Sequence, residues 1–217
     1  ISNYIKGETK NLSTSSCYVC GESKKNFMSD NIWQTNDQVD SEMLKFGPSP
    51  LHTTLRAGEW LMNTGIKCQI DAKVAMSSTQ FRDKKLEVQK QYAEQLKIRV
   101  FHVKPGFGSS NTGNVCRSVL KNSQVSSDIL GIEKNTIDRL DELISMINSQ
   151  TVIENAENIF HKKAQELFQI LKNSDKLQHL TLTPTVHRLI CHGHLYFKQF
   201  PVAVGQISES AFEHSHQ

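Results

Sequence analysis

Two pairs of metal-ligating side chains stand near opposite ends of the sequence. Cys17 and Cys20 form a Cys-x2-Cys pair that is followed by Gly21. His187 and His192 form a second pair, with four residues between them. Two thiolates at this spacing occupy one side of a tetrahedral zinc site, and a His pair can supply the other two ligands. Because the pairs lie so far apart, the zinc ion that they predict would tie the two ends of a domain together.

Spacing alone leaves other assignments of these residues open. Cys17 and Cys20 are also compatible with two surface thiols, and any His is compatible with an ordinary hydrogen-bonded polar group. Cys191 and His194 flank His192 and offer competing ligands. The sequence therefore favours zinc at the Cys pair and leaves the choice of its other ligands open.

The elements that must position these residues are helices. Apolar side chains recur at steps of three and four along several stretches, whereas strand-like alternation is confined to residues 98–103. The sequence therefore predicts a mainly α fold. We expect helices over residues 51–62, 76–100, 135–148 and 153–172, a short helix after a loop at 105–113, and a last helix from 183 to 197.

Two local patterns make these expectations more specific. Residues 46–50 (FGPSP) break the chain and prepare the next helix, which residues 63–65 (NTG) are expected to end. In the helix at 153–172, the apolar stripe that should face the core includes Ile159 and Phe160.

The composition is that of a soluble globular protein. The 217 residues are 37% hydrophobic and 22% charged, which allows one or two domains with a buried core. No apolar run is long enough to span a bilayer. A net charge of +3 permits a nucleic-acid partner without demonstrating one. Five Cys exclude a fully paired disulfide framework and favour a reducing compartment, with Cys68 and Cys116 as small core residues.

At the His pair, the sequence resembles the C-terminal catalytic region of the family that comprises Transib transposases and V(D)J recombinases. The resemblance rests on residues 185–193 (TVHRLICHG), followed by Pro201, Gly205 and Glu209. It spans nearly the whole chain. Further pieces in the family's order are the Cys pair, residues 47–52 (GPSPLH), residues 106–114 (GFGSSNTGN) with Arg117, and the helices at 135–172.

The resemblance implies a fold, cofactors and an activity. Members of this family have an RNase H-like core whose three acidic residues hold two divalent ions, Mg2+ or Mn2+, and they cleave and join DNA at element ends. A helical insertion, stitched by one structural zinc, precedes the third acidic residue. This chain would be that insertion, with Cys17, Cys20, His187 and His192 as the zinc ligands. Its parts would be an arm with the Cys knuckle (1–48), a helical domain (49–200), and the start of the segment that carries the last acid (201–217).

The third catalytic acid would follow the His pair. The family has Ser-Glu and then a second, metal-binding Glu, which assigns this role to Glu213, with Glu209 as the alternative. Two observations count against the match. His216 and Gln217 replace the family's Asn-Lys pair, and Ser210-x-x-Glu213 is also a helix capping box. The family's two aspartates would lie upstream of this sequence, so we expect the chain to be inactive alone.

The family binds double-stranded DNA, and two regions are candidates for that contact. Lys84 and Lys85 belong to a basic stretch at 76–104, although the acidic residues among them are equally typical of a solvated helix face. Asn114 and Arg117 follow the glycine-rich loop, at a position near bound DNA in the family. The resemblance also implies a homodimer and a nuclear location.

Two other interpretations of the sequence stand beside this one. The first is a non-catalytic, zinc-dependent DNA- or protein-binding module that derives from a transposon. The second is a helical scaffold without metal. Trp33 and Trp60 are expected to pack in the interior rather than to stack on bases.

Overall fold

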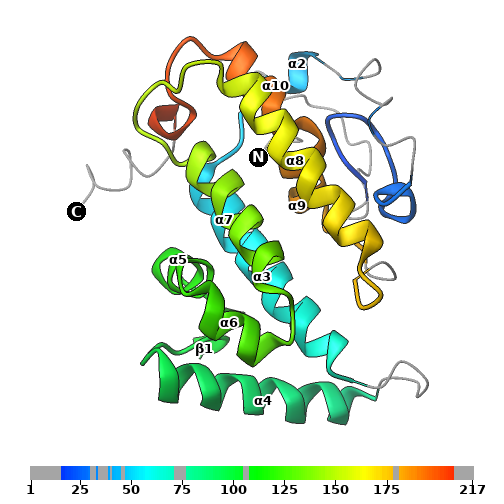
Figure 1. Ribbon diagram of the computed structural model, residues 1–217, viewed down its shortest axis with the longest axis vertical. Helices are drawn as coiled ribbons and strands as arrows, with labels where there is room; N and C mark the ends of the chain where they lie inside the picture. The colour runs from blue at the N-terminus through cyan, green and yellow to red at the C-terminus, as the bar shows by residue number, and fades with distance from the viewer. Residues whose placement is uncertain are drawn as a thin grey trace.

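The computed structural model is mainly helical, as the sequence predicts (Figure 1). It describes residues 16–29, 33, 39, 41–44, 47–70, 77–104, 108–177 and 181–207. In chain order the elements are η1 (Lys24–Asn26), α2 (Ser41–Leu44), α3 (Pro50–Cys68), α4 (Ser78–Gln95), β1 (His102–Lys104), β2 (Gly108–Ser110), α5 (Gly113–Lys121), α6 (Ser123–Leu130), α7 (Lys134–Ile147), α8 (Ala156–Asn173), α9 (Pro184–His187), η3 (Arg188–His192), α10 (Gly193–Gln199) and η4 (Val204–Ile207). η1 and η4 are 3-10 turns, and η3 is a π-helical turn. None of the helices described here combines the length and the apolar character that crossing a membrane requires.

Helix α3 runs through the middle of the molecule and packs against α5, α7 and α9 (Figure 1). Its start agrees with the predicted break in the chain. The Ser49 hydroxyl caps the backbone N–H of His52, and Pro50 occupies the first helical position, where its missing N–H costs no hydrogen bond. Because α3 contacts α4 as well as α9, it positions segments that lie far apart in the sequence.

The predicted end of α3 at residues 63–65 was wrong. The helix continues through Gly65 to Cys68. A Cβ added at Gly65 would lie 2.6 Å from the Cβ of Leu130 in α6, so the glycine permits close packing of two helices instead of ending one. Tertiary packing here outweighs the local tendency of an Asn-Thr-Gly sequence to stop a helix.

Helices α7 and α8 form an antiparallel pair, of which α7 packs on α3 (Figure 1). Their core-facing side chains include Leu140 and Leu143 of α7 and Phe160 and Phe168 of α8, all at most 1% exposed. Ile159 was expected to face the core as well, but it is 38% exposed. Since successive helical residues are about 100° apart, Ile159 cannot share the face of its neighbour Phe160.

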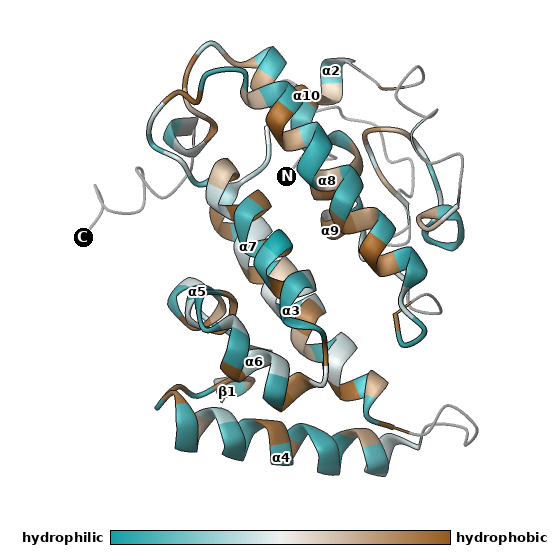
Figure 2. Cartoon of the chain, in the orientation of Figure 1, coloured by the Kyte–Doolittle hydropathy of each residue, from teal (hydrophilic) through white to brown (hydrophobic). Residues whose placement is uncertain are grey.

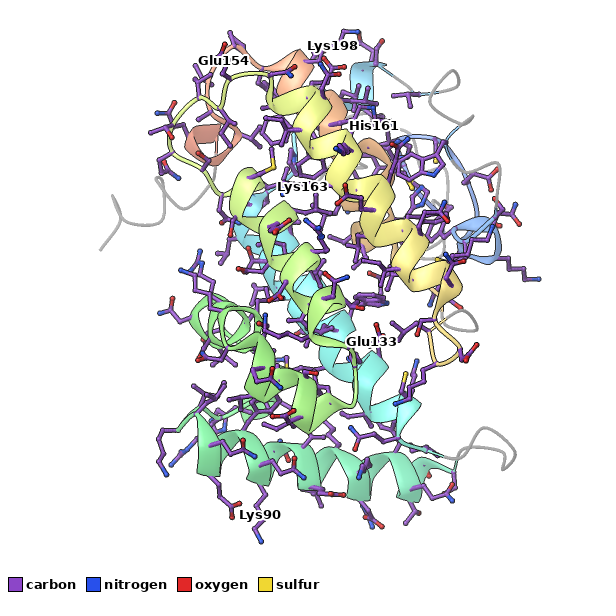
Figure 3. All side chains as sticks on the ribbon, in the orientation of Figure 1. Lys90, Glu133, Glu154, His161, Lys163 and Lys198 are labelled. Carbon is purple, nitrogen blue, oxygen red and sulfur yellow. The ribbon has the colours of Figure 1, made fainter. Side chains whose placement is uncertain are left out.

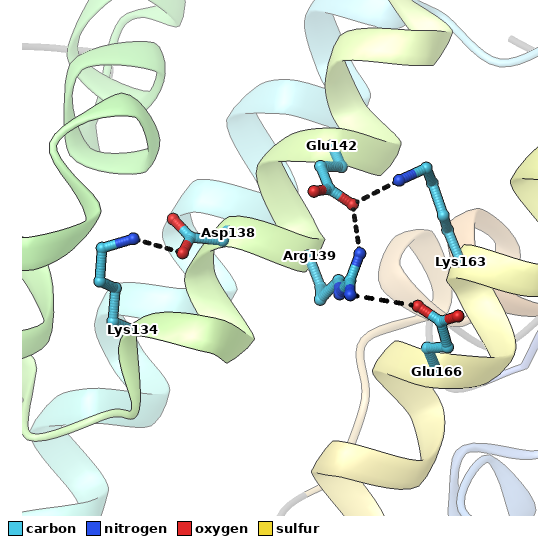
Figure 4. Close-up of polar contacts among 6 residues, drawn as sticks. All are labelled: Lys134, Asp138, Arg139, Glu142, Lys163 and Glu166. Atoms are coloured by element: carbon cyan, nitrogen blue, oxygen red, sulfur yellow. Dashed lines mark hydrogen bonds and ion pairs between the residues drawn. The ribbon is translucent and has the colours of Figure 1, made fainter.

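A network of ion pairs joins α7 to α8 at the surface (Figure 4). Arg139 contacts Glu142 at 2.9 Å and Glu166 at 3.4 Å. Lys163 of α8 contacts the same oxygen of Glu142 at 2.8 Å. Glu142 thus receives two cations from two helices, which fixes their relative position at the rim of the core.

Helix α4 crosses the lower end of the bundle and presents mostly polar side chains (Figures 1 and 2). It begins with a capping box between Ser77 and Gln80, and it buries only Val88 and Tyr92. The helix ends before the predicted residue 100, because Lys97 adopts a φ of +56°, through which a right-handed helix cannot continue.

Two elements differ from the sequence-based expectation after α4. Strands β1 and β2 pair antiparallel, with His102 opposite Ser110, so the predicted loop at 105–113 is in part a strand. Helix α6 was not predicted. It follows α5 directly after Asn122 and ends at Gly131, whose φ of +66° is the left-handed conformation that glycine adopts at helix ends.

Candidate metal centre

The Cys pair lies in a tight turn near the start of the described chain. An isolated bridge between Ser16 and Ser23 closes this turn. The Cys17 N–H donates to the carbonyl of Glu22, and the Gly21 N–H donates to the carbonyl of Cys17, both at 2.8 Å. Gly21 has a φ of +74°, which explains why glycine follows the second Cys. The turn therefore holds Cys17 and Cys20 on one side of a rigid knuckle.

The His pair lies on the last long helical stretch of the described chain. Thr183 caps the N–H of Val186 and Pro184 occupies the first helical position, so α9 starts where the sequence predicts. α9 ends at His187, and the five residues of η3 follow it up to His192. The predicted single helix is therefore interrupted by a π-helical turn between the two His residues.

This π-helical turn brings the two His residues into phase. In an α-helix, residues five apart point roughly 140° away from each other, because each residue advances about 100°. A π turn bonds residue i to residue i+5 and so places such residues one above the other. The rings of His187 and His192 lie edge to face with centroids 5.1 Å apart. A His-x4-His spacing can thus supply two ligands from a continuous helical segment.

The structure brings the four predicted ligands together. One ligand atom from each of Cys17, Cys20, His187 and His192 lies within 4.8 Å of the others. The Sγ atom of Cys20 is 3.5 Å from Nε2 of His187, across 167 positions of sequence. In a tetrahedral zinc site, bonds of about 2.0–2.3 Å place neighbouring ligand atoms roughly 3.3–3.8 Å apart. The geometry is therefore that of a group that could hold a metal ion.

The polar atoms of this group support the same conclusion. His187 and His192 have no exposed surface. Nδ1 of His187 and both ring nitrogens of His192 are buried without a hydrogen-bond partner. A buried polar atom without a partner is costly, and a metal ion that accepts the lone pair of an imidazole removes much of that cost. The residues present therefore fit a metal with nitrogen and sulfur ligands.

The thiols of the knuckle differ in acidity. A hydrogen bond from the Cys20 side chain, helped by backbone N–H groups, lowers the pKa of Cys17 to about 7. The same pairing, together with burial, raises the pKa of Cys20. Burial lowers the pKa of His187, which keeps its ring neutral. The lowered pKa values of Cys17 and His187 favour a thiolate and a neutral ring, the forms in which these side chains bind a divalent metal.

Two aromatic contacts support the candidate ligands, and neither was predictable from the sequence. The ring of Phe27 stacks on the ring of His187, with centroids 4.0 Å apart and planes 9° apart. The guanidinium of Arg188 lies 4.1 Å from the ring centroid of Tyr18, a residue that stands between the two Cys in the sequence. Both contacts join the segment at residues 16–29, which contains the knuckle, to the helical stretch that carries the His pair. A lone Phe and a lone Tyr in a polar segment show no periodicity, so only the tertiary structure reveals their role.

The competing ligands lie outside this group. Cys191 is fully buried, and burial raises its pKa well above the usual value, which disfavours the thiolate. The ring of His194 packs on His161 of α8 instead, with centroids 4.3 Å apart. Cys116 is buried, as expected, whereas Cys68 is only half-buried, with its Sγ 3.5 Å from the carbonyl oxygen of Lys176.

The candidate DNA-binding residues lie on two other helices. Asn114 and Arg117 are exposed on the first turns of α5 and contact each other at 3.2 Å. On α4, Lys84 pairs with Glu87 at 2.8 Å and Lys85 lies over the ring of Phe101 at 4.5 Å. The two lysines are thus engaged within the chain, whereas the α5 pair faces solvent.

The predicted catalytic glutamates and the two tryptophans remain to be placed. The predicted catalytic residues Glu209 and Glu213 lie outside the described residues. Trp60 is buried at 6% exposure, and Trp33 packs edge-on against Phe168, so both indoles have the packing role that the sequence predicts.

Comparison of the sequence with the models of known protein families and with curated proteins finds no match. The four-residue group and its supporting contacts are therefore the observations from which a function must be argued.

Proposed function

We propose that this chain is the zinc-stitched helical insertion of a DDE-type DNA transposase or recombinase. The single observation that carries the proposal is the convergence of Cys17, Cys20, His187 and His192 on one point. The Transib family, which this sequence resembles, has zinc ligands at the four matching positions. The order and separation of the four residues follow the family pattern. A metal shared between two segments 167 positions apart agrees with an insertion that leaves and re-enters another fold.

Zinc is the metal that this ligand set favours. Two thiolates and two imidazoles are soft to borderline ligands, whereas Mg2+ and Ca2+ prefer oxygen. Four protein ligands complete a tetrahedron and leave no position for water, so the ion has a structural role. Its effect is to hold the knuckle against α9 and η3.

The proposed reaction is hydrolysis of a DNA phosphodiester followed by strand transfer. Glu213, with Glu209 as the alternative, supplies one of three carboxylates, and the two aspartates lie on a core that precedes this sequence. Mg2+ or Mn2+ held by the three carboxylates supplies the chemistry that activates the attacking oxygen and stabilises the leaving one. The chain contributes the last acid and sets its position through the zinc-bound helical segment that precedes it.

The exposed pair on α5 supports a contact with DNA. Asn114 and Arg117 present an amide and a guanidinium at the start of a helix, where backbone N–H groups also favour a phosphate. Lys84 and Lys85 are weaker candidates because they are held within the chain. We further propose that the parent protein acts as a homodimer on paired element ends in the nucleus.

The test is DNA cleavage by a parent protein in which this chain follows its upstream sequence. Glu213→Gln is expected to abolish nicking of a duplex that carries the element end, while Glu209→Gln retains it. The opposite pattern would move the catalytic role to Glu209. Retained nicking in both variants would contradict the catalytic proposal and favour the alternative, a non-catalytic zinc-dependent binding module. A zinc content near one per chain in both variants serves as the control for folding.

A further inference from the structure

A cavity separate from the metal centre lies between four segments of the chain. It has a volume of about 570 Å³ and is bounded by α3, the start of α4, η1 and residues 181–183. This volume is within the range of about 300–1,000 Å³ that is typical of sites for small ligands. The walls come from positions far apart in sequence, so the cavity exists only in the folded domain.

Positive charge dominates the wall of this cavity. Lys24, Arg56 and Lys67 line it, and Glu59 is its one lining acid. Arg56 pairs with Glu59 at 2.9 Å, whereas neither Lys24 nor Lys67 forms an ion pair with a described residue. Within the part of the chain that the structure describes, no carboxylate pairs with these two ammonium groups.

Four lysines elsewhere, Lys84 and Lys90 of α4, Lys134 of α7 and Lys163 of α8, each pair with a carboxylate (Figure 4 shows the last two). Lys24 and Lys67 have no such pair with a described residue. The lining therefore carries more positive than negative charge, which attracts an anion.

Uncharged polar residues complete the lining. Asn63 and Thr181 line the cavity, and so does Trp60, which is 6% exposed. Ammonium and guanidinium groups donate hydrogen bonds and carry no acceptor. A ligand with several acceptor oxygens and negative charge matches this set of groups.

We propose that this cavity binds a small anion that carries phosphate groups. Phosphate oxygens accept charge-assisted hydrogen bonds from lysine and arginine, and such bonds are stronger than those between neutral groups. A volume of about 570 Å³ is the size of a small-molecule site, so we expect a small molecule rather than a duplex. The proposal concerns a ligand of the helical domain itself, and it does not depend on the transposase function.

Pyrophosphate is the test ligand, and calorimetry on the zinc-loaded chain is the measurement. We expect saturable binding that weakens about tenfold in Lys67→Gln, as expected for the loss of one charge-assisted contact. The double variant Lys24→Gln/Lys67→Gln is expected to lose binding. Lys25→Gln is the matched control, because Lys25 is exposed next to Lys24 but does not line the cavity. It should bind as the wild type does.

Tryptophan fluorescence locates the ligand. Pyrophosphate is expected to change the emission of the wild type and of Trp33→Phe, but not that of Trp60→Phe. Unchanged melting temperatures of the Lys variants without ligand show that they fold, since Lys67 is exposed.

Two results would overturn the proposal. The first is absence of pyrophosphate binding, or equal binding by the wild type and the double variant. The second is that a short DNA duplex binds in a way that requires Lys24 and Lys67, whereas pyrophosphate does not bind. These two residues would then form a nucleic-acid surface. The pyrophosphate measurement does not depend on whether the parent protein cleaves DNA. The anion site and the transposase function can therefore be rejected independently of each other.

Discussion

The imidazole of His187 stacks face to face on the phenyl ring of Phe27, with centroids 4.0 Å apart and planes 9° apart. Phe27 follows the Cys knuckle closely and is fully buried. The stack therefore fixes the orientation of the ring of His187, a candidate ligand that is 160 positions away in sequence. Residues that orient metal ligands contribute to affinity even when they do not touch the ion.

From this contact we predict that Phe27→Ala weakens zinc binding about 10- to 100-fold, the range typical of residues that orient ligands. Competition with a chromophoric chelator measures the change. Phe101→Ala is the control, since Phe101 is also buried but lies beside α4, away from the four ligands. It should lower stability and leave zinc affinity unchanged. Equal affinity in Phe27→Ala and the wild type would contradict the orienting role.

Removal of the metal should destabilise the folded chain without unfolding all of it. At a free zinc concentration of about 1,000 times Kd, binding adds about 4 kcal/mol to the free energy of unfolding. For a chain of this size, that corresponds to a loss of roughly 8–16 °C in melting temperature on chelation. Helices α5 and α7 should persist, because they pack directly on α3 and carry none of the four ligands.

Two Cys substitutions provide the matched comparison for chelation. Cys17→Ser removes a predicted ligand and should lower zinc content from about one to below about 0.2 per chain. Cys191→Ser changes a buried thiol one residue from His192 and should retain the metal. Full zinc content in Cys17→Ser, or a melting temperature that chelator does not change, would contradict a structural metal.

Regular features of the fold follow from the sequence, whereas features that depend on tertiary contacts do not. The apolar stripes of α7 and α8 and the Ser49 and Thr183 caps are local, and each was predictable from residue type and spacing. Gly65 shows the limit, because its neighbour Leu130 decides that the helix continues. Helix α6 is short and follows α5 without a loop, so no periodic pattern marks it.

The candidate site shows the same division between local and tertiary features. The Cys-x2-Cys knuckle is a local motif, and its turn is the one expected. The π-helical turn between His187 and His192 is a change of hydrogen-bond register that no residue type specifies. The contacts of Phe27 and Arg188 join segments that are remote in sequence, so their partners could not be deduced from spacing.

The ion-pair network between α7 and α8 predicts a pH-dependent contribution to stability (Figure 4; Figure 3 labels Lys163 on the whole chain). Lys163, and then Arg139, hold the pKa of the Glu142 carboxyl below its usual value. A carboxyl whose pKa is lower in the folded state stabilises the protein above its unfolded pKa, and this contribution is lost as the pH falls through the folded pKa. The network should therefore contribute at neutral pH and not in acid.

Glu142→Gln tests this contribution. Because the pairs are partly exposed, we expect a loss of only about 0.5–1 kcal/mol at neutral pH, or roughly 1–4 °C in melting temperature. The difference from the wild type should shrink in high salt and vanish in acid. Glu154→Gln is the control, since Glu154 is exposed and forms no ion pair with a described residue. A difference that is constant across the pH range would assign the effect to packing instead of charge.

The contact between Gly193 and Phe160 predicts a steric requirement next to the metal centre. Gly193 follows His192, and a Cβ at this position would lie 2.4 Å from the Phe160 ring. Gly193→Ala should therefore destabilise the chain by about 1–3 kcal/mol, the typical cost of overpacking, as measured by denaturant unfolding.

The double variant separates this steric effect from a change in helix propensity. Phe160→Leu shortens the opposing side chain, so Gly193→Ala should cost less than half as much in that background. Alanine favours helix over glycine by about 1 kcal/mol, which acts in the opposite direction to the clash. An equal cost of Gly193→Ala in both backgrounds would show that Phe160 does not impose the glycine, and that the close packing of α10 on α8 has another cause.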